Sequence, residues 1–190
     1  RNIYKMSRVT VFEPASPEEA YQYYKEAADL ARQLQTLVVL RLTTHVCHAR
    51  QKIAFGTWAG PPAFRTEFNR DNGPYIALTS MALEMKAASM EKQNQARQFA
   101  ADRGLNREGV SGDGSRMGII TSGLTFLSVM DVLESAAFRP DILKLAVVCP
   151  LDKDGVLAFL KAHEEVLILE ELDNILELEI KALAYDAGLS

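Results

Sequence analysis

Strand-like and helix-like patterns of apolar residues alternate in the C-terminal part of the chain. Residues 117–122 form an apolar run that turns, at Gly123, into apolar positions at helical spacing, a pattern that predicts a buried strand followed by a helix. The same unit recurs, with strands expected at 143–148 and 165–170 and helices at 152–162 and 173–185. Strands that alternate with helices through short links predict an α/β fold with a parallel sheet.

The N-terminal part shows the pattern of a strand, helix, strand crossover. A short β-rich run at 9–12 precedes Ser16, the expected N-cap of a helix, and Glu19 completes a capping box. This helix is expected to run to about Gln33 with one apolar face, and a buried strand is expected at 37–42. We expect the crossover to be right-handed.

Glycine and proline punctuate the middle of the chain around one long helix. Six such residues between 56 and 74 predict a loop. A helix is predicted over 79–103, with Gly104 as its C′ residue. Its apolar residues are few, which favours a bridging helix over one that builds a core. Residues 105–115 are expected to form a second linker, since they contain three glycines.

Composition and charge exclude several classes of protein. The net charge of −4 gives no basic stripe for nucleic acid, and no apolar run approaches the roughly 18 residues that span a bilayer. Cys47 and Cys149 lie far apart in the sequence, so we expect a reducing, cytoplasmic compartment rather than a disulfide scaffold. The first residue is Arg, and the strand at 9–12 has no preceding element, so we expect the chain to be a fragment.

A Gly-Asp-Gly sequence at 112–114 is similar to the opening of a thiamine diphosphate site. Such a site needs a preceding strand and a later Asn whose oxygen helps to hold a hard cation. Here a glycine-rich segment precedes the motif, and the later position holds Arg139-Pro140-Asp141. We therefore interpret the motif as part of a linker.

Three potential metal ligands, His45, Cys47 and His48, follow the second expected strand. A zinc site usually takes four protein ligands, or three with a supporting shell, and the chain has no second Cys or His cluster. The preferred interpretation is a hydrogen-bonding cluster at a domain interface, in which Thr43 and Thr44 take part. We predict no metal site.

The carboxyl edge of the sheet holds the other candidates. Thr121, Ser122 and Gly123 end a strand at a helix N-terminus, where free N–H groups favour an anion. Glu170 and Glu171 are expected at the same edge, where open α/β folds place ligands. Either structural capping or contact with a small ligand or partner fits these five residues.

Acidic residues are frequent near the C-terminus but are not arranged for acid and base catalysis. Asp173 is expected as a helix N-cap, and Glu177 and Glu179 fall on a solvated helix face. No nucleophile stands near a base at a readable position. We therefore predict no catalytic residue, and a free-standing, non-catalytic α/β binding module stays open as an alternative.

Residues 41–50, with Thr43, Thr44, His48 and Arg50 in place, resemble the Arg-Pro-Thr-Thr-Arg-x-Ser-His-x-Arg stretch of the large (alpha) subunit of indolepyruvate ferredoxin oxidoreductase. This subunit is one of the thiamine-dependent 2-oxoacid:ferredoxin oxidoreductases. The chain departs from the stretch at two positions, with His in place of Arg at 45 and Cys in place of Ser at 47. Further blocks resemble the family in the same order, at 11–21, 118–123, 143–151 and 166–173.

The resemblance implies three units and an absent active site. Residues 1–55 would be the last part of a pyrimidine-binding domain, 56–114 a connector with the long helix, and 115–190 a transketolase C-terminal-like domain. The family oxidatively decarboxylates aryl 2-oxoacids to acyl-CoA with thiamine diphosphate, Mg and 4Fe-4S clusters, and passes electrons to ferredoxin. By this resemblance the cofactor residues lie outside 1–190. The implied partners are a beta subunit, ferredoxin, CoA and the 2-oxoacid, and we expect a homo-oligomer.

Overall fold

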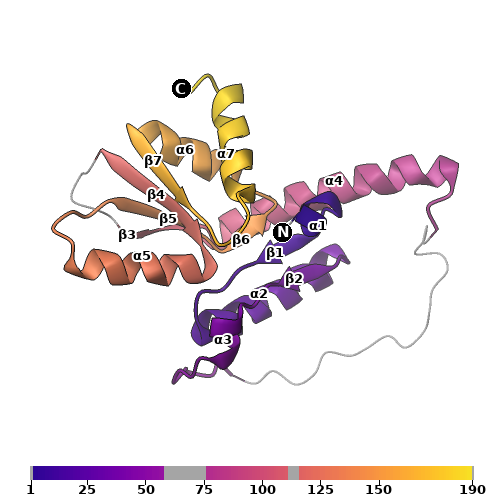
Figure 1. Cartoon of the computed structure of the whole chain (residues 1–190). Coiled ribbons are helices and arrows are strands. Elements are labelled where there is room, and N and C mark those ends of the chain that lie inside the picture. Colours follow the sequence, from indigo (N-terminus) through magenta and orange to yellow (C-terminus); the bar gives the residue numbers. More distant parts are fainter. Residues whose placement is uncertain (1, 58–75, 111–115, 190) are drawn as a thin grey trace.

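The computed structural model describes residues 2–57, 76–110 and 116–189 (Figure 1). The Gly-Asp-Gly motif at 112–114 and most of the glycine- and proline-rich stretch at 56–74 lie outside the described residues. In chain order the elements are α1 (Asn2–Met6), β1 (Thr10–Phe12), α2 (Pro17–Leu34), β2 (Val38–Leu40), α3 (Thr44–His48), α4 (Thr79–Asp102), β3 (Arg107–Val110), β4 (Met117–Ser122), α5 (Gly123–Ser135), β5 (Asp141–Leu145), β6 (Val147–Cys149), α6 (Lys153–Ala162), β7 (Glu165–Leu169) and α7 (Ile175–Asp186).

The strands form two sheets. In one, β1 lies between a parallel β2 and an antiparallel β6. The other has the order β3-β5-β4-β7, with β4 parallel to both β5 and β7. Helix α5 covers one face of this sheet and α6 and α7 cover the other (Figure 1). The predicted parallel α/β fold is confirmed, as is the strand, helix, strand unit at the N-terminus.

The strand expected at 143–148 is in fact two strands. β5 belongs to the four-stranded sheet and β6 to the three-stranded sheet, with Ala146 between them. Asn106 stabilises the break, because its Oδ1 accepts hydrogen bonds from the N–H groups of Ala146 and Val147, each at 2.9 Å. These two N–H groups therefore have hydrogen-bond partners at the point where the chain passes from one sheet to the other. One extended segment therefore joins the two sheets.

The second predicted linker contains a strand, so that prediction was wrong for its middle part. β3 pairs antiparallel with β5 at the edge of the four-stranded sheet. Its sequence includes Arg107, Glu108 and Gly109, and charged residues and glycine are poor strand formers. The pairing with β5, rather than the local sequence, therefore determines this strand.

Helix α2 begins with a variant of the predicted capping box. The Oγ of Ser16 accepts a hydrogen bond from the N–H of Glu19 at 3.2 Å. The Glu19 carboxylate in turn accepts from the N–H of Ala15 at 2.8 Å. In a capping box Glu19 would accept from the N–H of Ser16, whereas here it accepts from the preceding residue, so the box is confirmed at Ser16 only. Ser16 still marks where this helix begins.

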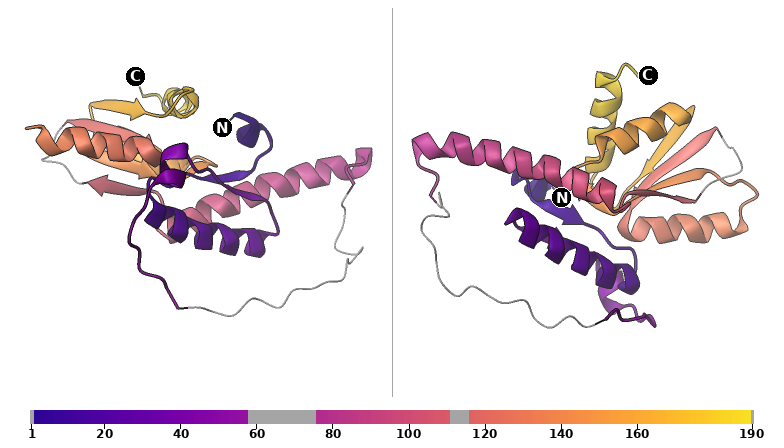
Figure 2. Two further views of the ribbon diagram at one scale, coloured as in Figure 1. Left: turned by 60° about the horizontal axis from the view of Figure 1, so that its bottom comes forward. Right: turned by 180° about the vertical axis from the view of Figure 1, so that it is seen from behind.

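The long helix α4 is confirmed, and it does more than bridge. Its last turns bury Ala96 and Ala100 in a core with Phe12 and Leu30, under the three-stranded sheet. Its N-terminal part projects beyond both sheets (Figures 1 and 2). The expectation that this helix does not build a core was therefore wrong for its C-terminal end. Gly104 follows it with φ at 56°, a conformation that favours glycine.

Candidate functional site

Polar side chains gather where several parallel strands end. Glu13 follows β1, Arg41 follows β2, Ser122 ends β4 and Glu171 lies shortly after β7. β1 and β2 belong to the three-stranded sheet and β4 and β7 to the four-stranded sheet, so these residues bring together the strand ends of both sheets. We refer to Glu13, Arg41, Ser122 and Glu171 as the junction cluster.

Glu13 is the centre of the junction cluster. Its side chain is only 1% exposed. One carboxylate oxygen lies 3.2 Å from Nη1 of Arg41, and the other accepts a hydrogen bond from the Ser122 hydroxyl at 2.9 Å. A buried carboxylate is tolerated when a cation and hydrogen-bond donors compensate for its lost hydration.

Arg41 connects strand ends that belong to different sheets. In addition to its contact with Glu13, its Nη2 lies 3.4 Å from Oε2 of Glu171. The backbone N–H of Arg41 also donates to the carbonyl of Phe12 at 2.8 Å. One guanidinium therefore pairs with two carboxylates and holds the β7–α7 loop against the three-stranded sheet.

The turn at Thr121, Ser122 and Gly123 meets a carboxylate from within the chain. Ser122 is the N-cap of α5, but its side chain makes no capping bond and its hydroxyl contacts Glu13 instead. Gly123 has φ at 53°, and Oε2 of Glu13 lies 3.6 Å from the position a Cβ would take there. An anion is favourable at a helix N-terminus, and Glu13 supplies a negative charge there.

The buried hydroxyl of Thr121 has no hydrogen-bond partner among the described residues. Thr121 itself is 0% exposed. The side chain is therefore closed off from solvent. The geometry therefore leaves a role for Thr121 in ligand contact as a prediction.

Glu170 caps the last helix. Its two carboxylate oxygens accept hydrogen bonds from the N–H groups of Leu176 and Glu177, at 3.0 and 2.9 Å. The N-cap position is held by Asn174, so the prediction that Asp173 is the N-cap was wrong. The Glu170 carboxylate, which directly follows β7, stabilises the start of α7 just as an N-cap side chain would.

A second buried ion pair lies nearby. Lys144, in the middle of β5, is only 2% exposed and forms an ion pair with Glu19 at the start of α2. Its Nζ also lies 4.4 Å from the centre of the Phe126 ring. Sequence reasoning missed this pair and the pairing of Glu13 with Arg41. A lysine between Leu143 and Leu145 in a strand expected to be buried was the available signal, because a buried ammonium needs a partner.

The His45 to His48 stretch is a short helix, α3, rather than the end of a strand. Thr43 is its N-cap, and its Oγ1 accepts from the N–H of Val46 at 3.4 Å. Thr44, Cys47 and His48 are exposed. Within the described part of the chain, no hydrogen bond or ion pair joins Thr43, Thr44 or His48 to the junction cluster.

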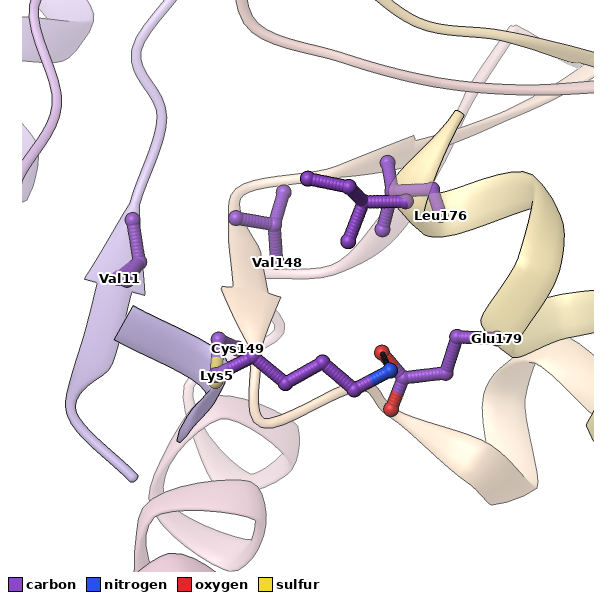
Figure 3. A pocket seen from close by; sticks show the side chains of 7 residues that line it. Lys5, Val11, Val148, Cys149, Leu176 and Glu179 are labelled. Atoms are coloured by element: carbon purple, nitrogen blue, oxygen red, sulfur yellow. Dashed lines mark ion pairs between the residues drawn. The ribbon is translucent and has the colours of Figure 1, made fainter. Parts of the chain in front are cut away.

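A small cavity of about 10 Å³, the size of one water molecule, lies between the sheet and α7. Val11, Val148, Cys149 and Leu176 line it, and Lys5 and Glu179 pair across its mouth at 2.9 Å (Figure 3). Burial, and then the charge of Glu179, raise the pKa of the Cys149 thiol to about 11. The thiol is therefore protonated at neutral pH and is a poor nucleophile there.

This chain does not supply the ligands of the 4Fe-4S clusters that the family resemblance implies. A 4Fe-4S cluster takes four cysteine thiolates, and the whole sequence has 2 cysteines. Residues 2–57, 76–110 and 116–189 contain no group of three or more His, Cys, Asp or Glu side chains that would hold a metal ion. No step of a reaction is therefore assigned to these groups in this chain.

None of the helices within the described ranges is both long and apolar enough to cross a lipid bilayer. No family model matches the chain.

The chain is similar to curated proteins named indolepyruvate oxidoreductase subunit IorA. It is 30% identical to the one from Methanothermobacter marburgensis over 189 residues, which covers 100% of this chain and 30% of the relative. It is 31% identical to the one from Thermococcus kodakarensis over 193 residues, covering 97% of this chain and 29% of that relative. The chain thus spans about 30% of the length of the curated relatives that it matches.

A solved structure supports the fold. The 2-oxoglutarate:ferredoxin oxidoreductase from Magnetococcus marinus, solved with 2-oxoglutarate, coenzyme A and succinyl-CoA bound, superimposes with a TM-score of 0.56 at 18% identity. The match covers 91% of this chain and 37% of that one. Along its whole length, this chain is a relative of a segment of indolepyruvate oxidoreductase subunit IorA, which confirms the family resemblance found in its sequence.

Proposed function

We propose that this chain is a segment of a thiamine diphosphate-dependent 2-oxoacid:ferredoxin oxidoreductase. The substrate is an aryl 2-oxoacid such as indolepyruvate, which is oxidatively decarboxylated to its acyl-CoA while ferredoxin is reduced. In this proposal the segment alone is inactive. Its role is to frame the cofactor site and the contact with a second subunit.

The similarity to IorA subunits over the entire chain is the observation that supports this proposal most. The internal structure agrees with a framing role. Arg41 pairs with both Glu13 and Glu171, and Glu170 caps a helix. Side chains engaged in this way position strand ends rather than react.

The cofactors belong, in this proposal, to parts of the enzyme outside these residues. Thiamine diphosphate with Mg supplies the carbanion chemistry and 4Fe-4S clusters carry the electrons. The units 1–55, 56–114 and 115–190 remain a prediction. β1 of the first unit pairs with β6 of the third, which suits a rigid frame shared between units.

The experiment uses the whole reading frame in which this segment lies, produced together with its second subunit. We expect indolepyruvate and CoA to support the reduction of ferredoxin. Arg41→Met, which removes the guanidinium between Glu13 and Glu171, is expected to lower this activity and the midpoint of thermal unfolding together. The matched control is Arg139→Met, because Arg139 is exposed and, within the described residues, its side chain donates a hydrogen bond only to the Glu134 carbonyl, at 3.5 Å. A purified complex that binds thiamine diphosphate and reduces no ferredoxin with any aryl 2-oxoacid would overturn the proposal.

A further inference from the structure

A short helix, α1, borders the cavity beside Cys149. Its walls come from the sheet, through Val11, Val148 and Cys149, and from the start of α7, through Ile175 and Leu176. Helix α1 lies over it and contributes Lys5 (Figure 3). Cys149 is half-buried beneath this helix, whereas Cys47 is exposed.

Few contacts hold α1 in place. Lys5 pairs with Glu179 of α7 at 2.9 Å, and both side chains are partly exposed, at 47% and 24%. Tyr4 packs against the core beneath. The remaining large side chains of α1, Ile3 and Met6, are 74% and 85% exposed. An ion pair of this exposure contributes little free energy, so the helix is weakly attached.

A turn at Arg8 connects α1 to the sheet. Arg8, between α1 and β1, has φ at 52°, in the left-handed region that side chains other than glycine seldom adopt. Its carbonyl accepts a hydrogen bond from Nε2 of Gln93 in α4 at 2.8 Å. The chain is thus anchored on the sheet side of the turn.

We infer that α1 is a strap over the Cys149 cavity, which opens and closes by rotation of the backbone at Arg8. The Lys5–Glu179 ion pair stabilises the closed form. Among the described residues, opening breaks the Lys5–Glu179 ion pair and exposes Tyr4, while the strands and α7 stay folded. Such local openings need much less free energy than global unfolding. Cys149 becomes accessible in the open form.

The burial that raises the pKa of Cys149 to about 11 makes the thiol a sensitive reporter of this opening. Attack on a disulfide reagent requires the thiolate. In the closed form the thiolate fraction at pH 8 is very small. In the open form hydration returns, so both access and ionisation increase.

The test measures the rate at which DTNB labels Cys149 in the Cys47→Ser chain at pH 8. Lys5→Met keeps the aliphatic stem and removes the charge that pairs with Glu179. It is expected to raise the labelling rate about two- to five-fold. The matched control is Lys181→Met, which changes the net charge equally and breaks an exposed pair with Glu177 on the same helix. It should leave the rate unchanged.

Two further readings separate strap opening from global unfolding. At low urea concentrations, the free energy of opening derived from the labelling rate should depend on urea far less steeply than the free energy of global unfolding does. The reason is that opening exposes little surface. Moderate salt, which screens a partly exposed ion pair, should raise the rate in the parent chain and not in Lys5→Met. Equal rates for Lys5→Met and the parent, or a urea slope equal to that of global unfolding, would overturn the inference.

Discussion

At the scale of single residues, Glu13 is the buried carboxylate at the junction of the two sheets. It is buried and contacts both Arg41 and Ser122. Glu13→Gln keeps the shape and removes the charge, so Arg41 keeps only Glu171 as a partner. Removal of one partner from a buried ion pair costs about 3 kcal/mol. We expect urea unfolding to show a loss of that size in the free energy of unfolding.

The control for this prediction is Glu164→Gln. Glu164 pairs with Arg116 at the surface, where both side chains are more than half exposed. The urea midpoint of this variant should equal that of the parent. Equal midpoints for Glu13→Gln and Glu164→Gln would show that the junction cluster does not stabilise the fold.

Cys149 makes stability depend on pH in the alkaline range. Burial raises its folded-state pKa from 9.0 to about 11, so the folded state keeps the proton to higher pH than the unfolded state does. The contribution is fully present below about pH 9 and is lost as pH rises through about 11. Cys149→Ala should make the decline in unfolding free energy between these pH values shallower than in the parent. An unchanged decline would contradict the shift.

At the scale of elements, Glu170 rather than Asp173 determines the start of α7. Glu170→Ala removes acceptors from the N–H groups of Leu176 and Glu177 and should cost about 1 kcal/mol, as the loss of a cap usually does. Hydrogen exchange at those two amides should become faster. Asp173→Ala is the matched control and should change neither quantity. The reverse result would restore the expectation drawn from the sequence.

Most elements could be predicted because periodicity and caps are local. The Ser16 N-cap and the apolar run of β4 specify their elements without help from the rest of the chain. The strand β3 and the break at Ala146 could not be predicted in this way. Both depend on Asn106 and on pairing with β5, contacts between residues distant in sequence that no local pattern encodes.

The candidate site was predicted only in outline. The carboxyl edge, with Ser122, Glu170 and Glu171, was identified from topology, but the partners of these residues were not. Glu13 and Arg41 lie 28 residues apart and Arg41 and Glu171 lie 130 apart. A single sequence gives no means of pairing charges at such separations.

At the scale of the whole molecule, the projecting part of α4 predicts self-association. Three large apolar side chains are exposed there: Ile76 (66%) and Leu78 (59%) just before the helix, and Leu83 (75%) within it. Apolar surface of this kind favours a contact with another chain. Light scattering should show a mass above that of the monomer at high concentration, and Leu83→Glu should lower it. A monomer at every concentration would contradict this prediction.

The two sheets are joined by one segment, β5 to β6, and by the junction cluster, and we propose that this frame holds no cofactor of its own. Isothermal titration with thiamine diphosphate and MgCl₂ tests that claim most directly, with the 190-residue chain compared with the whole reading frame. We predict heat of binding from the whole protein and none from the 190-residue chain. Saturable, stoichiometric binding by that chain alone would contradict the account.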